Sequence, residues 1–273
     1  MFYHLLTLTA TVISVAGHGR VLDPPSRASM WRYGFPTKPN YDDDGLNCGG
    51  FYRQHNRNHG KCGICGDPYD MQEPRTHEIG GTYGQGFIVE EYEAGQVFPI
   101  TVEITAHHKG YWYFKICPNP ETTDQSCFDE YPVPLENGGI KFYPPKEGIY
   151  KLNYRIPDGL FCEHCVLQWR YVAGNNWGVC DDRSSGLGCG SQETFGACSD
   201  ISISAPNYIQ SGPMPIHVAY LGQVDQGLLD LLRKMTPKPI KKKISKPSTN
   251  KKKKNYRKPR DKKTKHSKRK KVK

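Results

Sequence analysis

The stretch Thr101-Val102-Glu103-Ile104-Thr105-Ala106 alternates polar and apolar side chains without interruption. Successive side chains of a β-strand point to opposite faces, so this period of two is typical of a strand with one face in a core. The stretch extends back to Val97, and after the His107-His108 pair the residues Lys109-Gly110 predict a turn into a second apolar stretch, Tyr111–Cys117. Two strands joined in this way favour an antiparallel sheet.

Further stretches of the same kind recur, rich in Val, Ile, Tyr, Phe and Thr and separated by Gly, Pro, Asn and Asp. With the two above, the predicted strands are Gly86–Glu91, Val97–Ala106, Tyr111–Cys117, Gly148–Arg155, Cys165–Val172 and Ile216–Leu221. No regular alternation of strands with helices is present, which argues against a parallel α/β fold. We therefore expect an all-β domain over residues 18–222, an immunoglobulin/fibronectin-III-like antiparallel β-sandwich with long irregular loops and short helices.

Two segments depart from the strand pattern. Leu22–Gln85 is long and irregular, with many Gly, Pro, Asn and aromatic residues, and such stretches are usually functional or contain short helices. Residues 223–236 predict a short helix or linker, because Asp225–Met235 places Leu228, Leu229, Leu231 and Leu232 in an amphipathic pattern.

Residues 1–17 predict a secretory signal peptide. They contain no Lys, Arg, Asp or Glu, Leu5–Val15 is mostly apolar, and Val15-Ala16-Gly17 supplies the small residues that precede a cleavage site. The segment is short for a membrane span and no stop-transfer pattern follows, so we expect a secreted, extracellular protein without a membrane span. Cleavage after Gly17 would give His18 a free α-amino group, which titrates near ~8, beside an imidazole that titrates near ~6.5. A cleavage site one or two residues away would leave His18 an ordinary histidine.

The cysteine content indicates a disulfide-rich domain. The ten cysteines are Cys48, Cys62, Cys65, Cys117, Cys127, Cys162, Cys165, Cys180, Cys189 and Cys198. Behind a signal peptide, an even number predicts up to five disulfides, and spacing does not decide their connectivity. The alternative is zinc, because His55-x3-His59-x2-Cys62-x2-Cys65 has suitable ligand types and spacing. The predicted oxidising compartment favours disulfides here and at Cys162-x2-Cys165.

The C-terminal segment 237–273 is strongly cationic. It holds 20 of the 38 Lys and Arg residues and one acid, Asp261, so it carries +19 while the rest of the chain carries −8, which gives the net +11. With few apolar residues it is predicted to be disordered. In a secreted protein we expect it to bind an anionic glycan or an acidic partner in a salt-dependent way, and not nucleic acid, or to act only as a solvating tail.

The pair His107-His108 follows the alternating strand, where a sandwich can hold functional groups on a rigid support. Neighbouring residues of a strand point to opposite faces, so one of the two histidines can face a site. With His18 at the N-terminus, two imidazoles and one amine would form a three-nitrogen site that suits copper. The alternative is a pair of surface histidines in a loop.

Several motifs resemble the lytic polysaccharide monooxygenases, most closely auxiliary-activity family 15. The run His18-Gly19-Arg20-Val21-Leu22-Asp23-Pro24-Pro25-Ser26-Arg27, followed by Met30-Trp31-Arg32-Tyr33-Gly34-Phe35, is similar to the start of a mature enzyme of this family. The similar motifs that follow in order are Asn47-Cys48-Gly49-Gly50, Lys61-Cys62-Gly63-Ile64-Cys65-Gly66-Asp67, Thr105-Ala106-His107-His108-Lys109-Gly110, and Gly188-Cys189-Gly190-Ser191-Gln192-Glu193-Thr194-Phe195-Gly196-Ala197-Cys198-Ser199-Asp200-Ile201.

This resemblance implies one copper ion in a histidine brace. The α-amino group and a ring nitrogen of His18 would bind it with a ring nitrogen of His108, while His107 takes a position that is often a non-ligand. Ala106 matches a small residue near the axial side of the copper. Phe195 matches the axial aromatic residue, and a phenyl ring cannot ligate.

The resemblance also implies the activity: copper cycling between Cu(I) and Cu(II), an external electron donor, dioxygen or hydrogen peroxide, and oxidation at C1 or C4 of a sugar. The expected substrate is a crystalline β-1,4-linked polysaccharide, chitin first and cellulose second, and the expected state is a monomer. Gln192 or Glu193 would hydrogen-bond near the metal, as outer partners tune such sites, or Glu193 is only a structural carboxylate.

Tyr41, Phe51 and Tyr52 lie in the irregular segment, where relatives build part of a flat binding face. Their alternative role is packing beneath a long loop, because large aromatic residues are buried on average. Two other functions stay open: a non-catalytic protein of the same fold that binds chitin or matrix glycans, and a binder of heparin-like glycans that acts through the cationic tail.

Overall fold

The computed structural model describes residues 18–206. The predicted signal peptide 1–17, the strand Ile216–Leu221, the helix Asp225–Met235 and the cationic segment 237–273 lie outside the described residues and stay predictions. Within 18–206, no helix is long and apolar enough to cross a membrane.

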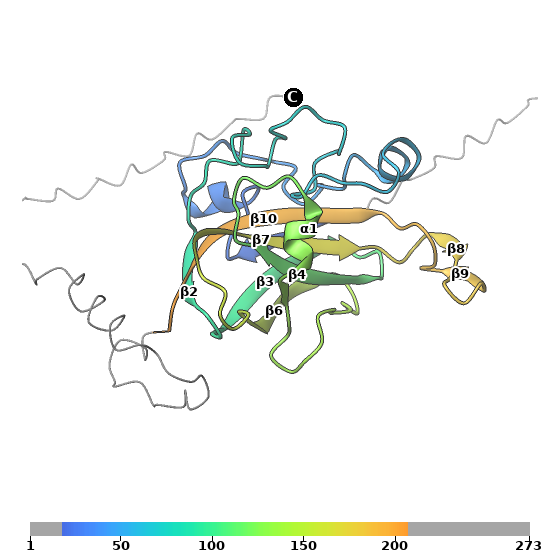
Figure 1. Ribbon diagram of the computed structural model, residues 1–273. Helices are drawn as coiled ribbons and strands as arrows, with labels where there is room; N and C mark the ends of the chain where they lie inside the picture. The colour runs from blue at the N-terminus through green and yellow to red at the C-terminus, as the bar shows by residue number, and fades with distance from the viewer. Residues whose placement is uncertain (1–17, 207–273) are drawn as a thin grey trace, which may run out of the picture. The chain divides into compact units, whose positions relative to one another are not determined.

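Two β-sheets pack into a sandwich (Figure 1). The smaller sheet has the order β1-β3-β6, with β1 at His18–Asp23, β3 at Val97–Ala106 and β6 at Gly148–Arg155. The larger sheet has the order β2-β10-β7-β4-β5, with strands Glu90–Glu93, Thr194–Ser204, Cys162–Val172, Tyr111–Cys117 and Pro132–Val133. A separate hairpin pairs β8 with β9, at Trp177–Val179 and Ser185–Leu187. The helical elements are short, at Met30–Tyr33, Arg53–Arg57 and α1 over Gln125–Asp129.

The core lies between the two sheets, and β3 shows why the sequence adopts this fold. Its alternate residues Phe98, Ile100, Val102 and Ile104 are buried, whereas the residues between them are not. The larger sheet contributes a matching set of buried side chains, which includes Trp112, Phe114, Trp169 and Tyr171. Each large apolar side chain buried in this way stabilises the fold by about 1.5–3 kcal/mol. The β-sandwich expected from the sequence is therefore confirmed.

The strand predictions differ in accuracy. β3, β4 and β6 have the predicted bounds, β7 begins three residues earlier, and β2 lies at Glu90–Glu93 and not at Gly86–Glu91. The central strand β10 was not predicted, because Phe195–Ile201 is buried on both faces and therefore shows no alternation. β10 also pairs with β2 in parallel, so the larger sheet is not purely antiparallel.

All ten cysteines form disulfides. The pairs are Cys48–Cys62, Cys65–Cys198, Cys117–Cys127, Cys162–Cys165 and Cys180–Cys189. Cys62 and Cys65, which the zinc hypothesis would need as thiolates, are thus both bonded to other cysteines. The structure excludes that zinc site and confirms the predicted disulfides.

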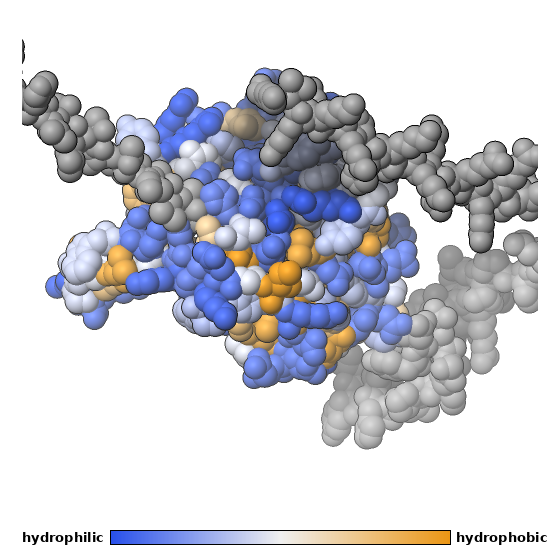
Figure 2. Space-filling view, turned by 180° about the vertical axis from the view of Figure 1, so that it is seen from behind, coloured by the Kyte–Doolittle hydropathy of each residue, from blue (hydrophilic) through white to orange (hydrophobic). Residues whose placement is uncertain are grey.

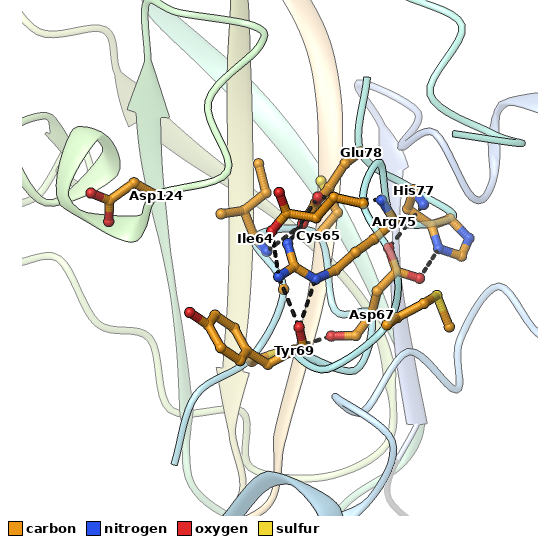
Figure 3. Close-up of polar contacts among 12 residues, drawn as sticks. Ile64, Cys65, Asp67, Tyr69, Arg75, His77, Glu78 and Asp124 are labelled. Atoms are coloured by element: carbon orange, nitrogen blue, oxygen red, sulfur yellow. Dashed lines mark hydrogen bonds and ion pairs between the residues drawn. The ribbon is translucent and has the colours of Figure 1, made fainter. Parts of the chain in front are cut away.

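The irregular segment between β1 and β2 is held by buried polar contacts. Arg27 and Asp200 are both fully buried and form a bidentate ion pair, which links this segment to β10. Arg75 donates hydrogen bonds to the carboxylate of Glu78 and to the carbonyl of Tyr69 (Figure 3). Buried charges that are paired and hydrogen-bonded fix one arrangement of the chain, so the loops over the larger sheet have a defined structure.

Candidate metal centre

Strand pairing brings His18 to the His107-His108 turn. β1 runs antiparallel to β3, so the first residue of β1 lies opposite the last residue of β3, and His18 pairs with Ala106. Gly19 permits this close approach, since a Cβ there would lie 3.0 Å from side-chain atoms of both Ile104 and Trp169. Residues far apart in sequence therefore meet at one end of the sandwich.

His107 and His108 point to different partners. Nε2 of His107 lies 2.8 Å from the carbonyl oxygen of Pro144. His108 is buried, with 5% of its surface exposed, and its Nδ1 lies 3.0 Å from Nδ2 of Asn175. Binding of a metal through Nε2 would require the proton of His108 on Nδ1, which would then donate to Asn175 with the amide turned to present its oxygen. The geometry thus separates the two histidines, as expected from their adjacent positions.

The backbone around His108 is fixed by the larger sheet. The hydroxyl of Tyr171 accepts a hydrogen bond from the His108 N–H at 3.1 Å and donates one to the carbonyl of Lys109 at 2.6 Å. Burial raises the pKa of Tyr171 to about 12, so the hydroxyl keeps its proton at neutral pH. The Gly174 N–H donates to the His108 carbonyl. Such supports hold a metal ligand in one orientation.

The turn after His108 depends on Gly110. Its φ is +72°, in the left-handed region, and a Cβ at this position would lie 2.0 Å from the carbonyl oxygen of Val172. Any other residue would push the turn away from β7 and move His108 with it.

The electrostatics of the site suit a metal cation. Burial lowers the pKa of His108, and electrostatic repulsion from His18 and His107 lowers it further. The ring is therefore neutral at pH 7, with a lone pair to donate. Among residues 18–206, no three His, Cys, Asp or Glu side chains gather as a metal site. A free α-amino group on His18, which the predicted cleavage after Gly17 would create, would add a third nitrogen to the two rings.

The donor set fits copper, which prefers nitrogen ligands of this type. Phe195 is fully buried and its ring centroid lies 6.4 Å from that of His18, so an aromatic ring without a ligating atom packs beside the first histidine. Ala106 lies opposite His18 and offers only a methyl group.

Gln192 and Glu193, both candidates for an outer hydrogen bond, have different surroundings. The Gln192 amide bonds to backbone atoms of Asn176 and Cys189, so it supports the hairpin. Glu193 accepts a hydrogen bond from Asn47 at 3.0 Å. Burial raises the pKa of Glu193, while Asn47 and the charge of His18 oppose that rise. Glu193 is therefore the acid within electrostatic reach of the first histidine.

The three candidate surface aromatics are exposed and do not belong to the core. Tyr41 and Tyr52 have 83% and 75% of their surface exposed, and Phe51 is the least exposed of the three. Tyr41 is held by an edge contact with the ring of Trp31, at 5.3 Å between centroids. This exposure argues against the packing alternative for Tyr41 and Tyr52, whereas Phe51 packs against the ring of His55 at 4.8 Å between centroids. Contact of all three with substrate stays a prediction.

Sequence reasoning assigned no role to Asn47, Asn175 or Tyr171. Asn47 begins the motif Asn47-Cys48-Gly49-Gly50, but its hydrogen bond to Glu193 joins residues that are 146 positions apart in the sequence. Asn175 and Tyr171 reach His108 from the end of β7 and the segment after it, and only the fold brings them there.

Comparison with known proteins gives the family. The family model described as "Lytic polysaccharide mono-oxygenase, cellulose-degrading" matches residues 18–201. The structure of an auxiliary-activity family 15 lytic polysaccharide monooxygenase from Thermobia domestica, in the Cu(I) state, is similar with 43% identity and a TM-score of 0.66, covering 69% of this chain and 99% of that one. A family 10 enzyme from Streptomyces lividans is similar with 16% identity and a TM-score of 0.45, covering 68% and 99% of the two chains. No curated protein sequence matches the chain.

The family match begins at His18 and covers most of the chain, including the β1–β3 pair that brings His18 opposite Ala106. The chain therefore belongs to the lytic polysaccharide monooxygenases, is similar to an enzyme of auxiliary-activity family 15, and is a copper-dependent enzyme that oxidises polysaccharides with electrons from an external donor.

Proposed function

We propose that the chain is secreted, is cleaved after Gly17, and then holds one copper ion in a histidine brace of His18 and His108. The observation that carries this proposal is the pairing of His18 with Ala106, two residues before a buried, neutral His108. In the full chain the His18 nitrogen is part of a peptide bond, so only cleavage makes it a ligand. The signal peptide that this cleavage removes would direct the protein out of the cell, where an extracellular polysaccharide is accessible.

We further propose that the substrate is chitin, with cellulose as the second candidate. The enzyme would act as a monomer and cleave β-1,4-glycosidic bonds. Bound copper would supply the one-electron chemistry that activates dioxygen or hydrogen peroxide against a C–H bond. The protein's own residues orient this chemistry. Tyr171 holds the backbone of His108 and Asn175 contacts its ring. Phe195 keeps a non-ligating ring beside His18, and Glu193 presents a carboxyl group within electrostatic reach of His18.

Substrate positioning would come from the exposed aromatic residues of the irregular segment. Tyr41 and Tyr52 present rings that can pack on the apolar faces of pyranose units. The cationic segment 237–273 would add adsorption to anionic glycans or an acidic partner, weakened by salt. This second contact does not need the copper site.

Replacement of each histidine of the pair tests the proposal. We expect His108→Ala to abolish the release of oxidised oligosaccharides from chitin with reductant and peroxide, measured by mass spectrometry. His107→Ala is the matched control and should retain activity, because His107 bonds to Pro144. Full activity of His108→Ala with loss in His107→Ala would contradict the ligand assignment. Parallel digestion of cellulose decides the substrate: faster oxidation of cellulose than of chitin would overturn the preference proposed here.

A further inference from the structure

The segment 43–47, part of the irregular region, passes beside the start of β1. The carbonyl oxygen of Asp44 accepts a hydrogen bond from the Gly19 N–H at 3.0 Å. Two residues further on, the carbonyl oxygen of Leu46 accepts one from the Gly196 N–H, also at 3.0 Å. The segment therefore bridges the start of β1 and the start of β10, which belong to different sheets.

β1 needs such a support because it is an edge strand. In the smaller sheet it pairs with β3 alone, and the register of this pairing shifts between His18 and Gly19. An irregular pairing at the end of an edge strand holds the backbone less firmly than a regular one. The Gly19 N–H donates to Asp44 and not to another strand. The segment 43–47 thus takes the place of a neighbouring strand, next to the histidine that we propose as a ligand.

Asp43 anchors the segment through buried ion pairs. Hydrophilic residues make up most of the coloured surface in Figure 2, so a charged side chain on that surface needs no special role. The carboxylate of Asp43 is instead fully buried, and it contacts the guanidinium groups of Arg20 and Arg32 at 2.8 and 2.6 Å. Arg20 also pairs with Glu103 of β3 at 2.8 Å. A buried carboxylate with two such partners fixes the segment against β1 and β3.

The side chain of Asp44 adds a direct contact with β3. Its Oδ2 accepts a hydrogen bond from Oγ1 of Thr105 at 2.7 Å. Thr105 precedes Ala106, the residue that lies opposite His18 in the pairing of β1 with β3. Asp44 therefore contacts both strands of this pair at the end where His18 lies, β1 through its backbone carbonyl and β3 through its carboxylate.

We propose that Asp44 and Thr105 position the amino terminus of the mature chain, so that the α-amino group of His18 stays beside His108. The inference rests on the proposed histidine brace and adds two positioning residues that act through Gly19 and not on the metal. The contacts that hold His108 come from the larger sheet and the segment after it, so they should remain when the contact between Asp44 and Thr105 is lost.

Hydrogen exchange of the copper-free mature protein tests the structural part of the inference. Thr105→Val removes the hydrogen bond to Asp44 and should let the Gly19 amide exchange about tenfold faster, the effect of losing one hydrogen bond to a charged group. Thr105→Ser keeps the hydroxyl and should restore the exchange rate of the wild type. Thr101→Val is the matched control, because Thr101 lies four residues earlier on the same face of β3 and its hydroxyl has no hydrogen bond to residues 18–206.

Copper titration, with the paramagnetic resonance spectrum as a second readout, tests the functional part. Thr105→Val should bind copper about three- to tenfold more weakly, less than the loss of a direct partner of a ligand, and the nitrogen hyperfine pattern should change. Asp44→Ala removes the same hydrogen bond from the other side and should reproduce both effects. Thr105→Ser and Thr101→Val should keep the affinity and the spectrum of the wild type.

The outcomes separate this inference from the proposed function. Unchanged copper affinity and spectrum in Thr105→Val, equal effects in Thr101→Val, or an effect that Asp44→Ala does not share would overturn the inference. A three-nitrogen spectrum of the wild type would leave the histidine brace standing in each of these cases. A wild type without that spectrum would contradict the brace itself, whereas the exchange of the Gly19 amide in the copper-free variants would still show whether Asp44 and Thr105 hold β1.

Discussion

Asn175 should control the copper affinity of His108, although it is not itself a ligand. Its amide lies 3.0 Å from Nδ1 of His108 and would thereby determine which ring nitrogen faces a bound metal. Replacement by Ala removes this contact and lets the imidazole rotate. The backbone bonds that hold His108 from Tyr171 and Gly174 remain, so the fold should not change.

The expected loss follows from the surroundings of the contact. Partners that orient a metal ligand typically contribute 10- to 100-fold in affinity. Asn175 is exposed, so water can replace part of its hydrogen bond, and we place Asn175→Ala at the low end of that range. A tenfold larger dissociation constant for copper corresponds to a loss of about 1.4 kcal/mol of binding free energy.

Isothermal titration of copper into the mature protein measures this effect, with the paramagnetic resonance spectrum as a second readout. Asn176→Ala is the matched control, because Asn176 contacts Gln192 only through its backbone atoms. We expect it to bind copper as the wild type does. Wild-type affinity and spectrum in Asn175→Ala, or the same loss in Asn176→Ala, would refute the reasoning.

Two further predictions concern stability. Asp200→Asn leaves the buried guanidinium of Arg27 without its carboxylate and should lower the free energy of unfolding by about 3–5 kcal/mol at pH 7. Burial raises the pKa of Asp200, but hydrogen bonds led by that from Arg27 outweigh it and keep the pKa below 3.8. The advantage of the wild type should therefore hold above pH 3.8 and disappear as the pH falls through the lowered value, which urea unfolding at a series of pH values would show. Gly110→Ala places a Cβ against the carbonyl of Val172 and should reduce both the free energy of unfolding and the copper affinity. Gly138→Ala is the control, because Gly138 also has a positive φ but no atom within 4 Å of the added Cβ. It should lower the free energy of unfolding by about 1 kcal/mol and leave copper binding unchanged. Equal effects of the two glycine substitutions would show that the turn after His108 does not position the ring.

The sequence predicts β-strands where one face is buried and the other is not. β3 alternates because its outer residues face solvent, and its bounds follow from that pattern. β10 lies between the core and the irregular segment, so polar residues such as Asp200 are as deeply buried as Ile201, and the alternation is lost. The strands of the β8–β9 hairpin have three residues each, too few to show any period.

The proposed copper site can be predicted only in part from the sequence. His18 and His108 are proposed from the predicted signal peptide, the strand end and the family motifs. Their supports, Tyr171 and Asn175, are linked to His108 by sheet pairing and by the segment after β7, and no local spacing encodes such contacts. Whether Tyr41 and Tyr52 pack inside or face solvent likewise depends on how the irregular segment lies on the sheet.

Copper titration of two N-terminal forms tests the central claim most directly. One form begins at His18 and the other at Gly17, so they differ by one residue that removes the α-amino group of His18 from the site. We expect the first form to bind one copper ion and to show a paramagnetic resonance spectrum with three nitrogen ligands, and the second to lose that spectrum and bind far more weakly. The same three-nitrogen spectrum in both forms, or a secreted protein whose first residue is Arg20, would contradict the histidine brace.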